Sequence, residues 1–178
     1  MKKLKFYLKQ IYRLALSFKK QEEIVWSDLK KLHAEIDFKS GVYEKEKYIE
    51  TFFQIGDEKV GRFFHIIYDG YFDCRVKIID RFPIDLTSDI FILATHFNNL
   101  LTNGVVLVNV NENYVEFRQK REWTIHLLYP NEIYGQLSNH FSASEDIYNA
   151  FQRLVDVREA PAIIIADFLK EKENEKRS

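Results

Sequence analysis

The first twenty residues place apolar side chains with the period of an amphipathic helix. These side chains recur at spacings of four, three, four and three residues, at Leu4, Leu8, Ile11, Ala15 and Phe18. Such spacing puts them on one face of an α-helix, and the lysines lie mostly off that face. The pattern predicts one helix over residues 2–20 and a second that begins at Ser27 and ends before a break at residues 38–41.

From residue 48 onward the pattern changes to the alternation that is typical of strands. Asp69-Gly70 is a strong signal for a two-residue hairpin turn. Strands paired around this turn place His65 opposite Cys74, and we expect both side chains to point into the core. The same register puts Asp73 on the solvent-exposed face of the hairpin.

A second hairpin is predicted farther along the chain, with its turn at Glu112-Asn113. Its core face is expected to carry Val106, Val108, Val110, Val115 and Phe117. A helix over about residues 88–102 precedes this hairpin, and a long helix follows it from Ser142. Pro161 either kinks that long helix or begins a new one as its first residue.

This order of elements predicts an α+β fold, with a mainly antiparallel sheet of about five strands and helices packed on one face. We expect three segments along the chain. Residues 1–38 hold the basic amphipathic helix and the second helix, residues 39–172 form the α+β domain, and residues 173–178 are a charged tail.

Cysteine content and hydropathy indicate the compartment. The single cysteine, Cys74, excludes an internal disulfide and fits a reducing environment. No apolar run approaches the 18 or so residues that a membrane-spanning helix needs. We therefore expect a cytoplasmic location.

Charge is distributed unevenly along the chain. Residues 1–20 contain no acid and seven cations, namely Lys2, Lys3, Lys5, Lys9, Arg13, Lys19 and Lys20. The whole chain has 26 cations and 27 acids, so the part after residue 20 is net acidic. A nucleic-acid-binding surface spread over the whole domain is therefore not expected.

The basic helix is the feature with the strongest functional implication. Its apolar stripe (Leu4, Leu8, Ile11, Ala15 and Phe18) is the predicted partner-binding surface. The stripe could pack on its own sheet, on a second subunit, in a groove of an acidic partner, or on an anionic membrane surface. The sequence pattern leaves these four choices open.

Candidate chemistry is sparse. The five histidines have no metal-binding spacing, and no glycine-rich phosphate loop is present, so neither a metal nor a cofactor is expected. His65 beside Cys74 would fit a base–nucleophile dyad, although a buried thiol more commonly acts as a small apolar group. We therefore expect no enzymatic activity and no catalytic residue.

Three segments carry a resemblance to a known family. They are "HFNNLLTNGVV", "VNVNENYVEFR" and "AFQRLVDVREAPAIIIADFL". With the strand that ends near Pro83, they resemble the YbjN family over about residues 40–170. The resemblance implies the fold of the type III secretion chaperones and a small interaction module, described as a sensory-transduction regulator or as chaperone-like.

The leading hypothesis is a non-enzymatic module that holds a protein partner, as a homodimer or a heteromer. A second hypothesis is a peripheral membrane adaptor anchored by residues 1–20. A third is a small enzyme that uses His65 or His96 in a pocket between sheet and helix.

Overall fold

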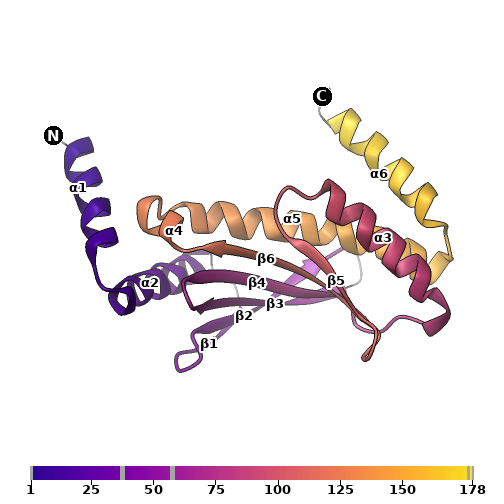
Figure 1. The fold of residues 1–178 in the computed structure, drawn as a ribbon, viewed down its shortest axis with the longest axis horizontal. Coiled ribbons are helices and arrows are strands. Elements are labelled where there is room, and N and C mark those ends of the chain that lie inside the picture. The colour runs from indigo at the N-terminus through magenta and orange to yellow at the C-terminus, as the bar shows by residue number, and fades with distance from the viewer. Residues whose placement is uncertain (1, 37–38, 57–58, 176, 178) are drawn as a thin grey trace. The chain divides into compact units, whose positions relative to one another are not determined.

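A computed structural model describes residues 2–36, 39–56, 59–175 and 177 of the chain (Figure 1). The helices are α1 (Lys2–Ala15), α2 (Phe18–Ile36), α3 (Thr87–Leu100), α4 (Thr124–Leu128), α5 (Glu132–Gln152) and α6 (Pro161–Glu175). The strands are β1 (Ser40–Tyr43), β2 (Tyr48–Ile55), β3 (Lys59–Tyr68), β4 (Tyr71–Ile79), β5 (Val105–Asn109) and β6 (Tyr114–Glu122). A 3-10 turn, η1 (Ile84–Leu86), precedes α3, and a π-helical turn, η2 (Arg153–Val157), follows α5.

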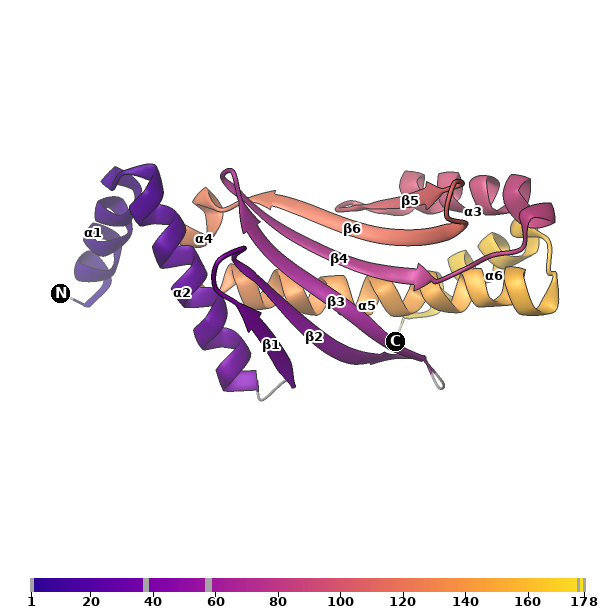
Figure 2. The same ribbon diagram turned by 90° about the horizontal axis from the view of Figure 1, so that it is seen from below.

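The strands form one antiparallel sheet in the order β1-β2-β3-β4-β6-β5 (Figure 2). This arrangement confirms the predicted α+β class. The sheet has one strand more than expected, because β1 pairs with β2 from Ser40↔Thr51 to Tyr43↔Tyr48. A strand of four residues that contains a glycine is too short to show an alternating pattern in the sequence.

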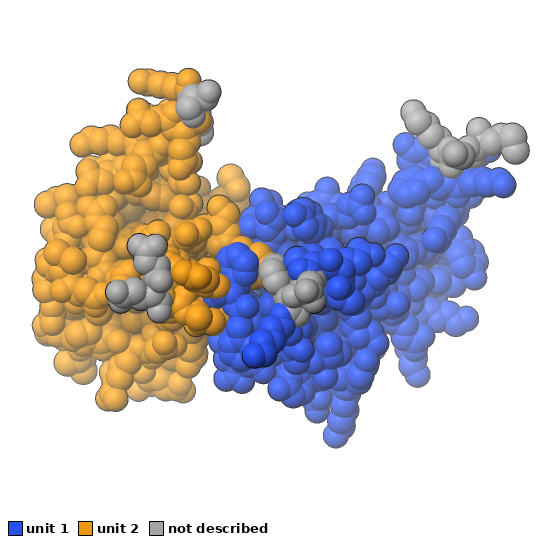
Figure 3. All heavy atoms as spheres, turned by 180° about the vertical axis from the view of Figure 1, so that it is seen from behind, with its two compact units in different colours: residues 1–53, 62–74, 120–140 blue, residues 54–61, 75–119, 141–178 orange. Residues whose placement is uncertain are grey.

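The chain divides into two compact units (Figure 3). Unit 1 comprises residues 1–53, 62–74 and 120–140, and unit 2 comprises residues 54–61, 75–119 and 141–178. The boundary expected after residue 38 lies outside the described residues. The boundary expected after residue 172 stays a prediction.

In unit 1, the first hairpin has the expected two-residue turn. Asp69 and Gly70 have φ angles of 46° and 82°, which suit the left-handed turn that such a hairpin needs. His65 and Cys74 are fully buried, so both point into the core as predicted.

Asp73 departs from its predicted position, because its side chain is fully buried. The alternating pattern assigned it to the wet face of the hairpin. However, β4 is an inner strand, with β3 on one side and β6 on the other. An inner strand has neighbours that a two-strand pattern does not include, so that pattern alone does not determine which of its side chains are buried.

The predicted helix over residues 2–20 is wrong at its end, because the chain breaks between α1 and α2. The Gln21 side chain donates hydrogen bonds to the carbonyl oxygens of Leu14 (2.8 Å) and Leu16 (3.1 Å). These carbonyls are the ones that a helix end leaves without an intrahelical partner. Ser17 directly precedes α2 and is a residue type preferred at a helix start, so α2 begins nine residues before the predicted Ser27.

In unit 2, α3 is joined to β5 by one side-chain amide. The Asn98 Nδ2 donates to the Val106 carbonyl oxygen (3.0 Å), and the Val106 backbone N–H donates to Asn98 Oδ1 (2.7 Å). Asn98 lies off the buried apolar stripe of α3 (Ile90, Leu93, Ala94 and Phe97), a position that favours a solvent-facing side chain. Its amide instead provides the two bonds that a neighbouring strand would give to Val106.

The second hairpin keeps its predicted faces but has a different register. Val106 faces Phe117 and Val108 faces Val115, a shift of two residues from the predicted pairing. Asn109 Oδ1 accepts bonds from the backbone N–H groups of residues 111 (3.0 Å) and 112 (3.1 Å), which opens a four-residue loop. Val110 therefore lies in the loop and is exposed, where a core position was predicted.

The long helix begins at Glu132, ten residues before the predicted Ser142. Its first half buries Gln136 and His140 beside Ile133 and Leu137, and these polar residue types hid the apolar period. Pro161 is the first residue of α6, which is one of the two predicted outcomes. Helix α6 continues to Glu175, so residues 173–175 of the predicted tail are helical.

Candidate partner-binding surfaces

Helix α1 carries two stripes of side chains on opposite faces. One stripe holds Leu4, Leu8, Ile11 and Ala15, and the other holds Phe6, Gln10 and Arg13. Both follow the i, i+4, i+7 spacing of a helix, and they are offset by two residues. At about 100° per residue, that offset puts the stripes on nearly opposite sides of the helix.

The stripe that faces unit 1 is mainly polar. Gln10 is buried, and the Arg13 guanidinium pairs with the Asp28 carboxylate of α2 at 2.8 Å. The same atoms form a hydrogen bond that is partly buried. The Arg13–Asp28 contact and the Gln21 bonds at the end of α1 attach this helix to α2 through polar groups that would otherwise bind water.

The apolar stripe of α1 faces away from unit 1. Leu4 is 65% exposed, Leu8 57% and Ile11 60%, and the small side chain of Ala15 is exposed as well. Exposed leucines are ordinary when single, but a continuous stripe of them indicates an interaction surface. Four of the five predicted partner-binding residues therefore lie together on an open helix face.

Phe18, the fifth residue of the predicted stripe, is separated from the other four by the helix break. It begins α2, and its ring centre lies 4.8 Å from that of Trp123 in unit 1. The Trp123 backbone N–H donates to the Gly70 carbonyl oxygen at 3.0 Å, so this tryptophan is fixed beside the hairpin turn. Phe18 is still 54% exposed.

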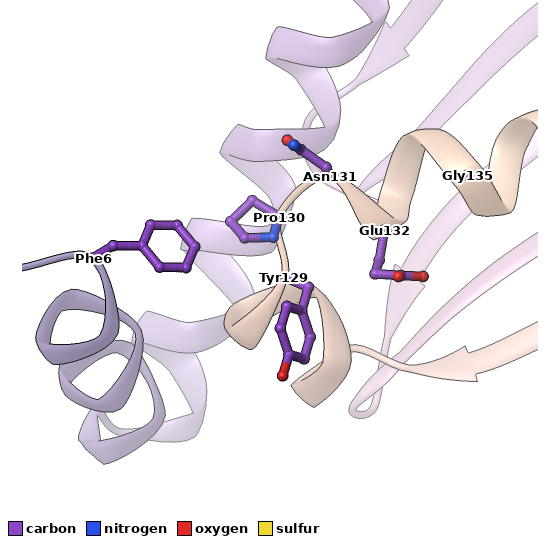
Figure 4. A pocket seen from close by; sticks show the side chains of 6 residues that line it. All are labelled: Phe6, Tyr129, Pro130, Asn131, Glu132 and Gly135. Atoms are coloured by element: carbon purple, nitrogen blue, oxygen red, sulfur yellow. The ribbon is translucent and has the colours of Figure 1, made fainter. Parts of the chain in front are cut away.

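A cleft of about 330 Å³ lies beside α1, in unit 1 (Figure 4). Phe6 lines one side of the cleft and points toward Pro130. Tyr129 lines the cleft from the turn between α4 and α5. Asn131, Glu132 and Gly135 complete the lining. Arg121 Nη1 lies 3.5 Å from Glu132 Oε2, so the polar end of the cleft is balanced in charge.

Unit 2 has an apolar groove between α3, α5 and α6, with a volume of about 270 Å³. The lining residues are Phe97, Leu100, Leu101, Ala143, Asp146, Ile147, Phe168, Leu169 and Lys172. The rings of Phe97 and Phe168 have their centres 5.2 Å apart, and Leu100 and Leu169 are 40% and 42% exposed. We call this set the unit 2 groove.

An ion pair lies at one side of the unit 2 groove. Lys172 Nζ is 3.0 Å from Asp146 Oδ2 and 3.1 Å from Glu175 Oε2. Burial lowers the pKa of Lys172, but hydrogen bonds to Asp146 and Glu175 outweigh it and raise that pKa overall. Lys172 is therefore charged at neutral pH, and the groove has an apolar floor with a polar margin.

The predicted approach of His65 and Cys74 does not produce a reactive dyad. His65 Nδ1 lies 3.0 Å from Nε2 of His33, a residue of α2. Burial, and after it the nearby Asp73 charge, raises the pKa of the Cys74 thiol well above its ordinary value. A thiol in such surroundings stays protonated at neutral pH and is a poor nucleophile.

His33 was missed as a partner of His65, although a signal was present. Val25, Trp26, Leu29 and His33 are the buried residues of α2, so the histidine continues the apolar stripe of that helix. Its Nδ1 lies 3.3 Å from the Thr51 hydroxyl oxygen and 3.4 Å from that of Ser40. Burial lowers the pKa of His33 to about 4.

The other three histidines occupy two buried positions and one exposed position. His126 and His140 are buried in unit 1, where their rings meet Phe72 and Phe63 edge to face. Exposed His96 lies on α3. Within the residues that the structure describes, no group of three or more His, Cys, Asp or Glu side chains could hold a metal ion.

Comparisons with known proteins give one match of note. No model of a known family matches the chain, and no curated protein matches it significantly. Among solved structures, a chain from the crystal structure of the ExsC–ExsE complex is similar over 75% of this chain and 94% of its own length. The two sequences are 15% identical and the TM-score is 0.49, so this likeness carries no statement about function.

Among the described residues, no helix combines the length and apolar character that crossing a bilayer requires.

Proposed function

We propose that the chain is a non-enzymatic protein-binding module that holds an apolar segment of a partner protein in the unit 2 groove. The observation that carries the proposal is the groove itself. Its floor is formed by aromatic and aliphatic side chains from three helices, and two leucines at its edge remain about 40% exposed.

The composition of the groove favours a peptide segment over a polar metabolite. Protein interfaces combine an apolar centre with a polar margin, and amphipathic helices commonly bury their apolar face between two other helices. A volume of about 270 Å³ has room for two or three large apolar side chains. The Lys172–Asp146 pair would then meet the polar flank of the bound segment.

The resemblance to the YbjN family, and through it to the type III secretion chaperones, supports the same proposal. Chaperones of that fold use apolar grooves to hold extended client segments, and we propose the same use for the unit 2 groove. The absence of a reactive thiol at Cys74 is consistent with a binding role, since its raised pKa removes the nucleophile of the candidate dyad.

A photo-cross-linking experiment tests the proposal. A benzophenone side chain placed at Leu169 should cross-link a partner protein in cells, since this residue lines the groove. The matched control is Ile163, which lies on the same helix, is 53% exposed and does not line the groove. We expect a specific product from position 169 and none from position 163.

Substitutions give a second measurement of the same surface. Leu169→Glu should reduce recovery of the cross-linked or co-purified partner by about tenfold or more, and Ile163→Glu should leave recovery within about twofold. A product between two copies of this chain would identify the partner as a second copy. Equal products from positions 169 and 163, or none from either, would contradict the proposal.

A further inference from the structure

Helix α1 has a surface that the unit 2 groove does not explain. Its mainly polar stripe holds buried Gln10, the paired Arg13 and the partly exposed Phe6, whereas its apolar stripe (Leu4, Leu8, Ile11 and Ala15) is exposed. A helix that only packed on its own domain would bury the apolar stripe and expose the polar one. The observed orientation is the reverse.

The charged side chains of α1 itself are all cations. Lys5 and Lys9 are exposed on α1, and Lys19 and Lys20 are exposed at the start of α2. No acid occurs among the first twenty residues. Cations near the start of a helix interact unfavourably with its dipole, and they also repel one another. An anionic surface would offset both of these unfavourable interactions.

Three kinds of partner are candidates to cover this stripe, namely a second copy of α1, an acidic protein and an anionic lipid surface. A second copy of α1 would bring two lysine-flanked stripes together, and like charges would repel at close range. An acidic protein would be recognised best by arginine, whose planar group binds carboxylates in pairs. The arginine of α1, Arg13, is already paired with Asp28, and the exposed cations are lysines.

Lysine and aromatic side chains fit a lipid surface. Long lysine stems can lie along apolar surface while their ammonium groups reach phosphates. Tyr7 and Tyr12 are 57% and 65% exposed beside the stripe, and tyrosines are enriched at the boundary between lipid headgroups and acyl chains.

We propose that α1 docks in the plane of an anionic lipid bilayer. Leu4, Leu8 and Ile11 enter the acyl boundary, and Lys5, Lys9, Lys19 and Lys20 contact phosphate groups. The Arg13–Asp28 pair and the Gln21 bonds hold α1 with this face outward before it meets the membrane. The protein is then a peripheral adaptor that brings a partner to the bilayer.

Vesicle flotation of the full-length protein tests the docking. The probes are vesicles of phosphatidylcholine alone and vesicles that contain about 30% phosphatidylglycerol. We expect at least about tenfold tighter binding to the anionic vesicles, and weaker binding as NaCl rises from about 50 to about 500 mM. Absence of binding, or equal binding to both vesicles, would overturn the proposal.

Two variant pairs separate the apolar and charged contributions. Leu4→Ser with Leu8→Ser should weaken binding by about tenfold or more, and Ile84→Ser, at a residue 77% exposed in unit 2, is the matched control. Lys5→Gln with Lys9→Gln should have a similar effect. Its control is Lys39→Gln with Lys45→Gln, two exposed lysines outside the helix. Controls that lose as much binding as the test variants would overturn the assignment to α1.

A fluorescent probe reports whether α1 itself enters the lipid. The single native cysteine, Cys74, is buried, so an environment-sensitive thiol reagent attached at Leu8→Cys labels α1 selectively. We expect a blue shift with anionic vesicles, and none for the same probe at Lys45→Cys. If the Leu4/Leu8 variant loses a co-purifying acidic protein while the wild type ignores vesicles, the occupant is that protein and the lipid proposal is wrong.

Discussion

His33 on α2 and His65 on β3 share a hydrogen bond, with 3.0 Å between Nε2 and Nδ1. One ring donates and the other accepts, so the pair requires at least one neutral ring. Burial, followed by the charge of His33 and then that of His140, lowers the pKa of His65 well below its ordinary value. This contact joins the second helix to the sheet within unit 1.

Acid should destabilise unit 1. Burial lowers the pKa of His126 to about 4 and that of His140 to about 3, as it does for His33 and His65. An unfolded chain binds protons near pH 6.5 that the folded chain does not bind. The free energy of unfolding should therefore fall as the pH drops from about 6.5 to about 4, by at most about 1.4 kcal/mol per pH unit for each histidine.

Thermal melts followed by ellipticity between pH 7.5 and 4.5 measure this dependence. His140→Gln should make the dependence shallower, because it removes one of the titrating rings. His96→Gln is the control, since His96 is exposed on α3. A melting temperature that stays constant down to pH 4.5 would contradict the prediction.

Asn98→Ala should destabilise the fold by about 1–3 kcal/mol, because it leaves both backbone groups of Val106 without the amide that now bonds them. The neighbouring Asn99→Ala should cost less than about 0.5 kcal/mol. Urea denaturation of the two variants measures the difference. Equal midpoints would show that the amide contributes little.

Two glycines should respond in opposite directions to alanine. Gly104 has a φ of 99°, and an added Cβ would lie 2.7 Å from Phe117 Cε2 and 2.7 Å from Gln119 Cγ. Gly104→Ala should therefore lower stability by about 2 kcal/mol or more. Gly135 lies within α5 with no atom near its added Cβ, so Gly135→Ala should raise stability by about 0.5–1 kcal/mol. Denaturation midpoints that shift in the same direction would refute this pair of predictions.

Cys74 should resist thiol reagents in the folded protein. Its side chain is fully buried and its pKa is raised. Modification should be at least about a hundredfold slower than in denaturant, because it must await an opening of the fold. The rate of reaction with a chromogenic disulfide at pH 8 measures this protection. Fast reaction under native conditions would show that the hairpin opens readily.

The sequence was sufficient for the features that depend on local chemistry. Asp69-Gly70 needs positive φ angles, which few other residue pairs adopt, and the predicted turn is confirmed. Pro161 lacks a backbone N–H, so it could only kink the helix or begin a new one, and it begins α6.

Features that depend on tertiary packing could not be predicted in the same way. Asp73 is buried on an inner strand, whose neighbours a two-strand pattern does not include, and the start of α5 was hidden by buried Gln136 and His140. The unit 2 groove brings together residues of three helices far apart in the sequence, so no local pattern indicates it. The stripe of α1 was visible in the sequence, but its outward orientation was not, because the Arg13–Asp28 contact joins two helices.

Both tryptophans of the chain, Trp26 and Trp123, are buried in unit 1. Their indole emission is therefore an intrinsic reporter of that unit, whereas unit 2 contributes to ellipticity without contributing tryptophan signal. A denaturation followed by both signals measures the cooperativity between the units directly. Coincident curves would mean that the chain unfolds in one step, and separate curves would give each unit its own stability.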